Sequence, residues 1–228
     1  YEIRLSLVGS EMCIRDSRKE PVKMKKKHLL LSITLLCILF SMTACGQKAS
    51  SNSSSDDTQN LLSGKHHVAI EVNSYGTIEA ELDADTAPVT VTNFINLANS
   101  GFYNGLTFHR VIDGFMIQGG DPNGDGTGGS SEKIKGEFKS NGVQNNISHV
   151  RGTISMARSS ANNSASSQFF IMQKDTTSLD GKYAAFGTVT SGMDIVDKIC
   201  KDCTDTNQNG VITDKSKQPV ISTIRVVD

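Results

Sequence analysis

The stretch FHRVIDGFMIQGGD, residues 108–121, carries the most structural information in this 228-residue chain. Alternation of apolar and polar side chains predicts two short strands, at 108–112 and 115–118, on either side of an Asp-Gly turn. Arginine and glutamine stand among the apolar residues, where an ordinary core strand has little use for them. A ligand-binding cleft has this make-up, because it is mostly apolar with a few placed polar groups. We therefore expect this stretch to form one wall of a binding groove.

The same alternation predicts which side chains of this wall share a face. Phe108, Arg110 and Ile112 would lie on one side of the first strand, with Phe108 packed beneath the wall. In the second strand, Met116 and Gln118 would share a face. The wall would therefore present a cation and an amide next to large apolar side chains.

The pattern of apolar residues from residue 65 onward predicts a mainly β domain. This domain has about 164 residues, which is long enough for one hydrophobic core. Segments 67–73 and 77–82 alternate around Ser-Tyr-Gly and predict a β-hairpin. Further strands are predicted at 147–156, 168–173, 184–189 and 221–227. Many short strands without strict βα alternation favour an antiparallel barrel or sandwich with helical plugs.

Two segments change to the helical period. In the first, residues 87–100, the apolar face would be formed by Val91, Phe94, Ile95 and Ala98. Asp85 and Thr86 offer capping oxygens at its start, and a glycine follows its end. In the second, residues 194–200, the inward side chains would be Met193, Val196, Ile199 and Cys200. We expect the first helix to pack on the sheet.

The first 64 residues differ in character from the domain. Met24 is followed by three lysines and then by an apolar run at 29–40, which is the layout of a secretory signal. This run is shorter than the about 20 residues that a membrane span needs. We therefore expect residues 24–44 to be a signal peptide and residues 1–23 to be a non-native leader. The alternative is that residues 1–23 are a genuine N-terminal extension.

Residues 41–46, Ser-Met-Thr-Ala-Cys-Gly, resemble the lipobox of bacterial lipoproteins, with Met42 where leucine is more usual. The resemblance implies cleavage before Cys45 and a diacylglyceryl group on its sulfur. Two acyl chains suffice for stable anchoring, whereas one is marginal. Residues 45–64 would then be the lipidated cysteine and a flexible linker, since 47–60 is rich in Ser, Asn and Asp and has nothing to bury.

Without residues 1–44 the chain carries 15 basic and 20 acidic residues, a net charge of −5 with histidine neutral. No basic stripe remains, so we expect no nucleic-acid partner. Two cysteines remain in the domain, Cys200 and Cys203, as a single C-x-x-C pair. Without a second Cys or His pair nearby, a structural zinc site is not expected. We favour a local disulfide or two inert thiols over redox catalysis.

Several linked motifs resemble those of the cyclophilins, which are peptidyl-prolyl cis-trans isomerases. They are the stretch quoted above, Ser-Met-Ala at 155–157, Ser-Gln-Phe-Phe-Ile at 167–171, and Leu-Asp-Gly-Lys at 179–182 followed by Phe-Gly at 186–187. Their order and spacing are those of the family, from about His67 to the C-terminus. The resemblance implies a cyclophilin-like domain over residues 65–228. Its fold would be a closed eight-stranded antiparallel β-barrel capped by two α-helices, which agrees with the elements predicted above.

The resemblance also implies the roles of the site residues. Arg110 would donate to the prolyl nitrogen, which localises the nitrogen lone pair as the bond twists. Gln118, with the backbone near Ala157 and Arg158, would hold the carbonyl on the turning side. The socket for the proline ring would be formed by Phe115, Met116, Phe170 and Leu179, and the groove would also be lined by Gln168 and Tyr183. Because no bond is broken, no nucleophile, metal or cofactor is expected.

Three positions depart from the eukaryotic pattern of the family. Ser178 stands where a tryptophan usually borders the pocket, and the chain contains no tryptophan. Tyr183 stands where a histidine is usual, as in many bacterial members, and Arg158 replaces a common asparagine. Loss of the indole donor should weaken cyclosporin binding more than catalysis, since the wall with Arg110 is intact.

Two further features have alternative interpretations. Asp205, Asn207 and Asn209 match the start of a calcium loop. The twelfth position holds Ser216 instead of a bidentate glutamate, so we favour an Asx-rich turn. His109 could act as a base beside a serine, but no nucleophile elbow is present and alternation turns it away from the groove. We favour a packed histidine.

The sequence therefore predicts a peptidyl-prolyl isomerase, lipid-anchored on the extracytoplasmic side of a bacterial cell membrane. We expect a monomer that acts on proline-containing unfolded or exported polypeptides. The alternative is a binding module, in which the groove holds proline segments as a chaperone or adhesion surface and turnover is incidental. The presence of Arg110 and Gln118 favours the enzyme.

Overall fold

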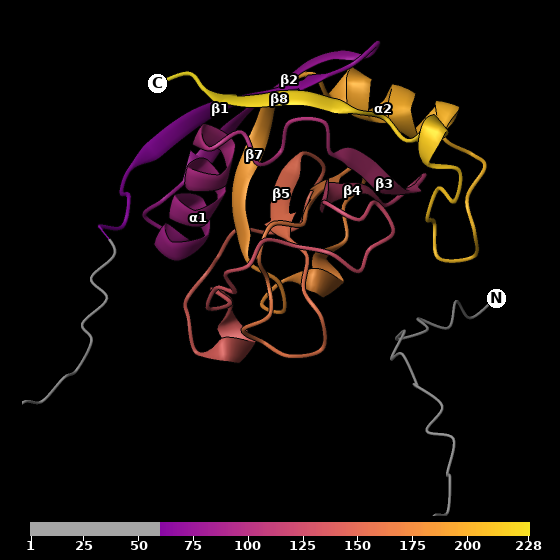
Figure 1. Cartoon of the computed structure of the whole chain (residues 1–228). Helices are drawn as coiled ribbons and strands as arrows, with labels where there is room; N and C mark the ends of the chain where they lie inside the picture. The colour runs from indigo at the N-terminus through magenta and orange to yellow at the C-terminus, as the bar shows by residue number, and fades with distance from the viewer. Residues whose placement is uncertain (1–59) are drawn as a thin grey trace, which may run out of the picture. The chain divides into compact units, whose positions relative to one another are not determined.

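The computed structural model describes residues 60–228 (Figure 1). The predicted leader, the signal peptide, Cys45 and the linker as far as residue 59 lie outside the described residues. The first described residues already contact the domain, because the Leu62 amide donates to Thr92 Oγ1 (2.9 Å) and the Gly64 amide donates to Asp85 Oδ1 (2.7 Å). Between residues 60 and 228, no helix has the length and apolar character needed to cross a membrane.

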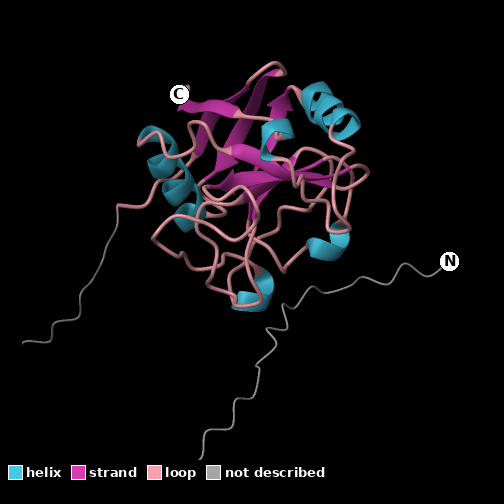
Figure 2. Cartoon of the chain, turned by 45° about the vertical axis from the view of Figure 1, so that its right-hand side comes forward, coloured by secondary structure: helices cyan, strands magenta, loops and turns pink. Residues whose placement is uncertain are grey.

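Eight strands form one antiparallel sheet that curls into a half-barrel (Figures 1 and 2). The strands are β1 (Lys65–Val72), β2 (Gly76–Asp83), β3 (Thr107–Ile112), β4 (Met116–Asp121), β5 (Thr153–Met156), β6 (Phe169–Met172), β7 (Ala185–Ser191) and β8 (Ile221–Val226). Their spatial order is β3-β4-β6-β5-β7-β2-β1-β8. A mainly β domain with eight antiparallel strands and two α-helices is confirmed.

The prediction of a closed barrel is wrong, because the edge strands β3 and β8 do not form a ladder. Among the described residues, Thr107 of β3 forms an isolated bridge to Val220, the residue that precedes β8. Beyond this bridge the loop at 205–212 takes the free edge of β3, where the Val111 amide donates to the Gly210 carbonyl (2.8 Å). The loop thereby satisfies backbone groups that a neighbouring strand would otherwise need to pair.

The predicted strand at 147–156 forms only over its last four residues. β5 begins after Gly152, whose φ of +90° is not an extended conformation. Upstream, the amide of His149 donates to the Asp180 carboxylate (2.7 Å) instead of to a neighbouring strand. The first six residues of the predicted strand are therefore a loop. The other predicted strands and both helices are present, with ends shifted by a few residues.

Two helices lie on opposite sides of the curled sheet (Figures 1 and 2). Helix α1 (Pro88–Asn99) packs against β8 and β2, and helix α2 (Met193–Asp202) packs against β2, β3 and β4. The predicted apolar faces are confirmed, since the buried residues include Val91, Phe94, Ile95 and Ala98 in α1 and Val196, Ile199 and Cys200 in α2. Three short 3-10 helices lie in the connections, η1 (Lys139–Asn141), η2 (Thr177–Leu179) and η3 (Lys215–Lys217).

Helix α1 is capped by a residue far along the chain. Glu137, in the β4–β5 connection, is buried, and its Oε2 accepts from the Thr90 amide (2.8 Å) and the Thr90 hydroxyl (2.7 Å). The prediction that Asp85 and Thr86 supply the cap is wrong. The Asp85 amide (3.1 Å) and the Thr86 hydroxyl (2.9 Å) both donate to Asp83, in the turn that precedes the helix.

The sheet separates a large hydrophobic core from a smaller apolar cluster. In the core, aromatic rings pack around Phe169, whose centroid lies 5.3 Å from Phe94, 5.7 Å from Tyr103 and 6.0 Å from Phe108. The smaller cluster is built on Met116, Phe170 and Met172. Because successive side chains of a strand point to opposite faces, Phe169 and its neighbour on β6 belong to different clusters.

Candidate active site

The smaller cluster gathers the predicted socket residues on one face of the sheet. Strand pairing places Met116 beside Met172 and Gln118 beside Phe170. The partly buried side chains packed against this cluster are Ile112, Phe115, Ala157, Leu179 and Tyr183. The structure therefore brings together all four predicted socket side chains, from β4 and the residue before it, from β6 and from the η2 turn. We call Met116, Phe170 and Met172, together with the five side chains packed against them, the socket cluster.

A β-bulge in β3 determines which residues share a face with Arg110. The pairing with β4 shifts so that Phe108 lies opposite Gly119 and Arg110 lies opposite Gln118. The extra residue, His109, reverses the alternation, and Phe108 therefore lies in the core. The predicted shared face of Phe108 and Arg110 is wrong, whereas the packing of Phe108 beneath the wall is confirmed.

His109 is fully buried in this bulge. Among the described residues, neither of its ring nitrogens has a hydrogen-bond partner. Burial lowers the pKa of His109 from its ordinary value, which keeps the ring neutral. This environment is that of a packed histidine.

A chain of polar groups borders the socket cluster. Arg110 Nη1 donates to Gln118 Oε1 (3.0 Å), and Gln118 Nε2 donates to Gln168 Oε1 (2.8 Å). Gln168 Nε2 in turn donates to the carbonyls of Gly128 (2.7 Å) and Gly126 (3.2 Å). The glycine-rich loop after β4 thus holds one end of this series of hydrogen bonds, and the Arg110 guanidinium forms the other end.

Arg110 is held from another side by the loop that follows α2. Its Nε donates to the Asn209 carbonyl (2.8 Å), and Asn207 shapes this loop because its Oδ1 accepts from the amides of Asn209 (2.9 Å) and Val211 (3.0 Å). Burial lowers the pKa of the Arg110 guanidinium from its ordinary value, which marks a partly desolvated cation. Within residues 60–228 no acceptor binds its Nη2, so this nitrogen can donate to a substrate.

The loop at 205–210 has the geometry of an Asx turn, the interpretation favoured from the sequence. Asn207 Oδ1 is engaged by two backbone amides, and Asp205 Oδ2 lies 2.7 Å from Lys217 Nζ. In the described part of the chain, no group of three or more His, Cys, Asp or Glu side chains could hold a metal ion. The oxygens of the candidate calcium ligands Asp205 and Asn207 are thus directed to a lysine and to amides.

Cys200 and Cys203 are free thiols at the end of α2. Burial raises the pKa of Cys200 to about 12 and also raises the pKa of Cys203. Because the thiolate is the reactive form of cysteine, both thiols are poor nucleophiles near neutral pH. Their environment favours two inert thiols over a redox pair.

Arg158 and Tyr183 form a rim beside the socket cluster. The Arg158 guanidinium carbon lies 4.9 Å from the ring centroid of Tyr183 and 4.9 Å from that of Phe138. Its Nε donates to the Lys182 carbonyl (2.9 Å), and the Tyr183 ring meets Phe170 edge to face at 5.9 Å. The guanidinium is therefore stacked between two rings and tied to the backbone.

Two residues of this region were not predicted from the sequence. Met172 lies two positions after Phe170, so the strand period alone could have placed it on the same face. His149 stacks on Phe170 with ring centroids 6.0 Å apart. No local pattern indicates that contact, because the two residues come from separate segments.

A curled eight-stranded half-barrel with two helices, and with a guanidinium beside an apolar socket on one face, defines the cyclophilin class of folds. Residues 67–226 match the family described as cyclophilin type peptidyl-prolyl cis-trans isomerase/CLD. The chain therefore belongs to this family.

Curated relatives and solved structures agree with this assignment. Peptidyl-prolyl cis-trans isomerase A of Dickeya dadantii is 49% identical over 131 residues, which cover 55% of this chain and 67% of that protein. Peptidyl-prolyl cis-trans isomerase B of Bacillus subtilis is 49% identical over 117 residues, which cover 51% and 78%. A crystal structure of a Cryptosporidium parvum cyclophilin type peptidyl-prolyl cis-trans isomerase matches with a TM-score of 0.63 at 30% identity, covering 72% of this chain and 99% of that chain.

Proposed function

We propose that this chain isomerises X–Pro peptide bonds without covalent chemistry, with Arg110 acting on the prolyl nitrogen. Its family and its named relatives make the chain a peptidyl-prolyl cis-trans isomerase (EC 5.2.1.8). The observation that carries the mechanism is the position of the guanidinium at the edge of the socket cluster, with Nη1 4.0 Å from Met116 Sδ. A proline ring seated on that cluster has its nitrogen beside the charged donor.

The chemistry follows from amide resonance. Rotation about an X–Pro bond is slow because resonance opposes it, with a barrier of roughly 18–20 kcal/mol. A donor aimed at the nitrogen localises the lone pair and so removes double-bond character as the bond twists. Arg110 is always charged and presents its donors in a rigid fork. Because its surroundings are partly desolvated, a hydrogen bond made only in the twisted state stabilises that state strongly.

Arg110 and the socket cluster can together supply the rate acceleration that an isomerase needs. Uncatalysed isomerisation takes about 10–100 s at 25 °C. A turnover on the order of 10² per second needs about 10⁴-fold acceleration, or roughly 5–6 kcal/mol. A single donor preorganised for the transition state contributes roughly 2.7–4 kcal/mol, and orientation of the ring in the socket adds to it.

We assign the carbonyl on the turning side to Gln118 and to the backbone after β5. The Ala157 amide is already used, because it donates to the Gln168 carbonyl (2.9 Å). The Arg158 amide makes no hydrogen bond within the described residues, so it is the backbone donor that we assign to the substrate there. Gln118 Nε2 donates one hydrogen to Gln168 Oε1, and this bond fixes the orientation of the Gln118 amide. The second hydrogen of Nε2 is the one that we assign to the substrate carbonyl.

The direct test is an isomerisation assay of the full chain on a short proline peptide. We expect the cis-to-trans rate to rise in proportion to enzyme concentration. If the chain binds the peptide without accelerating the exchange, the groove is a binding module for proline segments and not an enzyme site.

We also propose that the chain is an exported lipoprotein that assists the folding of secreted proteins at the outer face of the cell membrane. Support comes from the sequence, in which Met24, the apolar run at 29–40 and the lipobox cysteine Cys45 follow in the order of a lipoprotein signal.

Replacing the lipobox cysteine should release the protein from the membrane. Two acyl chains on Cys45 would anchor the chain stably. We therefore expect wild type in the membrane fraction and labelled by palmitate, and Cys45→Ser unlabelled in the soluble fraction or the medium. Cys203→Ser is the control and should stay in the membrane fraction. Palmitate labelling of Cys45→Ser equal to that of wild type would contradict the anchor.

Cyclosporin should inhibit this chain weakly. Ser178 is exposed in the η2 turn, next to Leu179 of the socket cluster, and supplies neither an indole donor nor an aromatic face. We expect Ser178→Trp to tighten cyclosporin inhibition by about tenfold, the equivalent of one added hydrogen bond, while kcat/KM stays within about threefold. Thr177→Trp, at the neighbouring exposed position, should not change inhibition. A nanomolar inhibition constant for wild type would contradict this prediction.

A further inference from the structure

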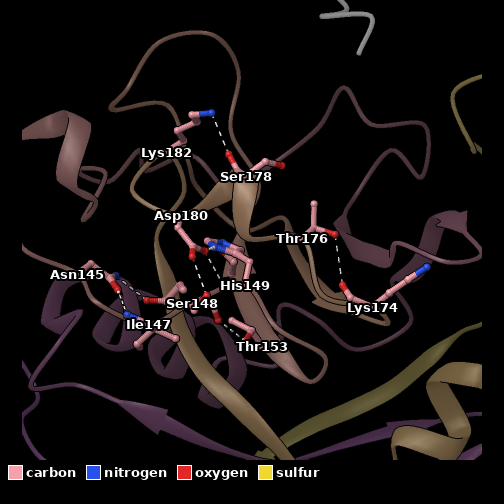
Figure 3. Close-up of polar contacts among 12 residues, drawn as sticks. Asn145, Ile147, Ser148, His149, Thr153, Lys174, Thr176, Ser178, Asp180 and Lys182 are labelled. Atoms are coloured by element: carbon pink, nitrogen blue, oxygen red, sulfur yellow. Dashed lines mark hydrogen bonds and ion pairs between the residues drawn. The ribbon is translucent and has the colours of Figure 1, made fainter. Parts of the chain in front are cut away.

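Three polar side chains, Ser155, His149 and Asp180, are linked in a line beside Phe170 of the socket cluster. Figure 3 shows Asp180 next to His149. Asp180 Oδ1 lies 2.9 Å from His149 Nδ1, and His149 Nε2 lies 3.0 Å from Ser155 Oγ. The carboxylate also accepts from the His149 amide (2.7 Å) and from the Ser148 hydroxyl (2.6 Å). His149 and Ser155 are fully buried, so the line leads from the surface at Asp180 into the sheet.

The partners determine where the hydrogens of this line lie. An ionised carboxylate only accepts, so His149 Nδ1 carries a hydrogen and Nε2 accepts from the Ser155 hydroxyl. Burial raises the pKa of the Asp180 carboxyl, but the hydrogen bonds from Ser148 and His149 outweigh burial and the pKa is lowered. Burial lowers the pKa of His149, and Asp180 opposes that shift only in part. The imidazole is therefore neutral.

This order of groups is that of a hydrolytic triad, but the serine is not placed to act as a nucleophile. Ser155 has no exposed surface, and it pairs with Phe170 inside the sheet. A nucleophile must come within about 3–3.5 Å of the atom that it attacks, and no substrate carbonyl reaches Ser155 Oγ. Any effect of these three residues on the groove therefore comes from the packing of the His149 ring against Phe170 and Tyr183.

The imidazole contacts two walls of the socket cluster. Its ring lies 6.0 Å from the Phe170 ring, with an angle of 21° between the planes, and meets Tyr183 edge to face at 6.4 Å. Asp180 directly follows Leu179 in the chain. The single side chain of His149 thus connects the β6 wall with the turn that carries the other wall.

We propose that His149 and Asp180 are positioning residues of the isomerase groove, holding Leu179 and Tyr183 at a set distance from Phe170. This inference rests on the proposed function, because its effect is on how the proline ring is seated. The ring is small, and misplacement of a seating group by about 1 Å can cost up to about 10²-fold in rate. The line therefore sets the width of the socket.

Protonation of His149 would disrupt the line. A charged imidazole carries hydrogens on both nitrogens, so the Ser155 hydroxyl would have to change from donor to acceptor. Asp180 is the charged group that acts on His149, and Tyr183 is the other titratable side chain packed against it. Because the pKa of His149 lies below its ordinary value of 6.5, the neutral ring persists above that pH and activity is lost as the pH falls.

The test compares the full chain with His149→Gln and Asp180→Asn in a protease-free isomerisation assay from about pH 5 to about pH 8. At the alkaline end, kcat/KM should fall by about tenfold in both variants. Wild type should lose activity along an acid limb below pH 6.5. This limb should be absent in His149→Gln. In Asp180→Asn it should move to lower pH, because the carboxylate that favours the charged ring is gone.

Thr90→Val is the matched control, because it also deletes a buried hydrogen bond to a carboxylate, outside the socket cluster. It should lose stability but keep the wild-type kcat/KM and acid limb. The proposal is overturned if both groove variants keep wild-type kcat/KM, or if His149→Gln keeps the acid limb at the same pH. A wild type without isomerase activity would instead overturn the proposed function. The NMR signals of the Leu179 and Tyr183 amides, which should titrate in wild type and not in His149→Gln, would then decide the positioning role.

Discussion

Replacing Arg110 with alanine should lower kcat/KM on a proline peptide by about 10²–10³-fold, the loss expected when one preorganised transition-state donor is removed. The guanidinium is held by Gln118 and by the Asn209 carbonyl, so it is already oriented when the substrate binds. In the proposed mechanism, its hydrogen bond to the prolyl nitrogen strengthens only as the bond twists, so the loss should appear mainly in kcat. The measurement is steady-state isomerisation of a short proline peptide by wild type and by Arg110→Ala.

Two further variants define this result. Arg110→Lys keeps the charge but loses the planar fork that Gln118 and Asn209 hold, so it should recover only part of the activity. Arg225→Ala removes an arginine that pairs with Glu71 at the surface, on β8, and should leave kcat/KM unchanged. Equal activity in wild type and Arg110→Ala would contradict the mechanism, provided that circular dichroism shows both to be folded.

Glu137→Ala should strongly destabilise the folded domain, because Glu137 is the cap of α1. Glu137 is 3% exposed, and its carboxylate accepts three hydrogen bonds from the first turn of α1. The substitution leaves the two buried donors of Thr90 and the half-buried amide of Val89 without this acceptor, and it removes a negative charge from the positive end of the helix. We expect the free energy of unfolding to fall by about 2–4 kcal/mol, measured by urea denaturation as a lower midpoint with an unchanged slope.

The controls for this prediction separate the cap from the loss of a charge in general. Glu79→Ala removes an exposed glutamate of β2 and should change the unfolding free energy by less than about 0.5 kcal/mol. Glu137→Gln keeps one acceptor oxygen and the shape of the side chain, so its effect should be intermediate. If Glu137→Ala were as stable as Glu79→Ala, the interpretation of Glu137 as the cap of α1 would be wrong.

Most of the secondary structure was predictable because its signals are local. The apolar positions of α1 recur at helical spacing, and the strands on either side of Gly76 alternate, so each pattern needs only a few neighbouring residues. The segment 147–152 shows where this reasoning fails. Its residues alternate like a strand, but the His149 amide bonds to Asp180, and a partner that is 31 residues away leaves no local trace.

The candidate site was predictable in its membership but not in its geometry. Arg110, Gln118 and the socket residues stand in motifs that resemble a family, and the structure brings them onto one face. Alternation placed Phe108 beside Arg110, whereas the bulge at His109 puts it in the core. A bulge adds one residue to one strand only, and whether it forms depends on the strand opposite.

The elements, the family resemblance and the chemical character of the groove are predictable from the sequence, because periodicity and linked motifs are properties of residues close together in the chain. Three features required the folded structure: the barrel stays open at β3, Glu137 caps a helix 47 residues away, and His149 stacks on Phe170 of the socket cluster. Each of these depends on which distant groups satisfy one another's hydrogen bonds once the backbone is folded. These hydrogen-bond partners are set by the fold of the whole domain and not by neighbouring residues in the sequence.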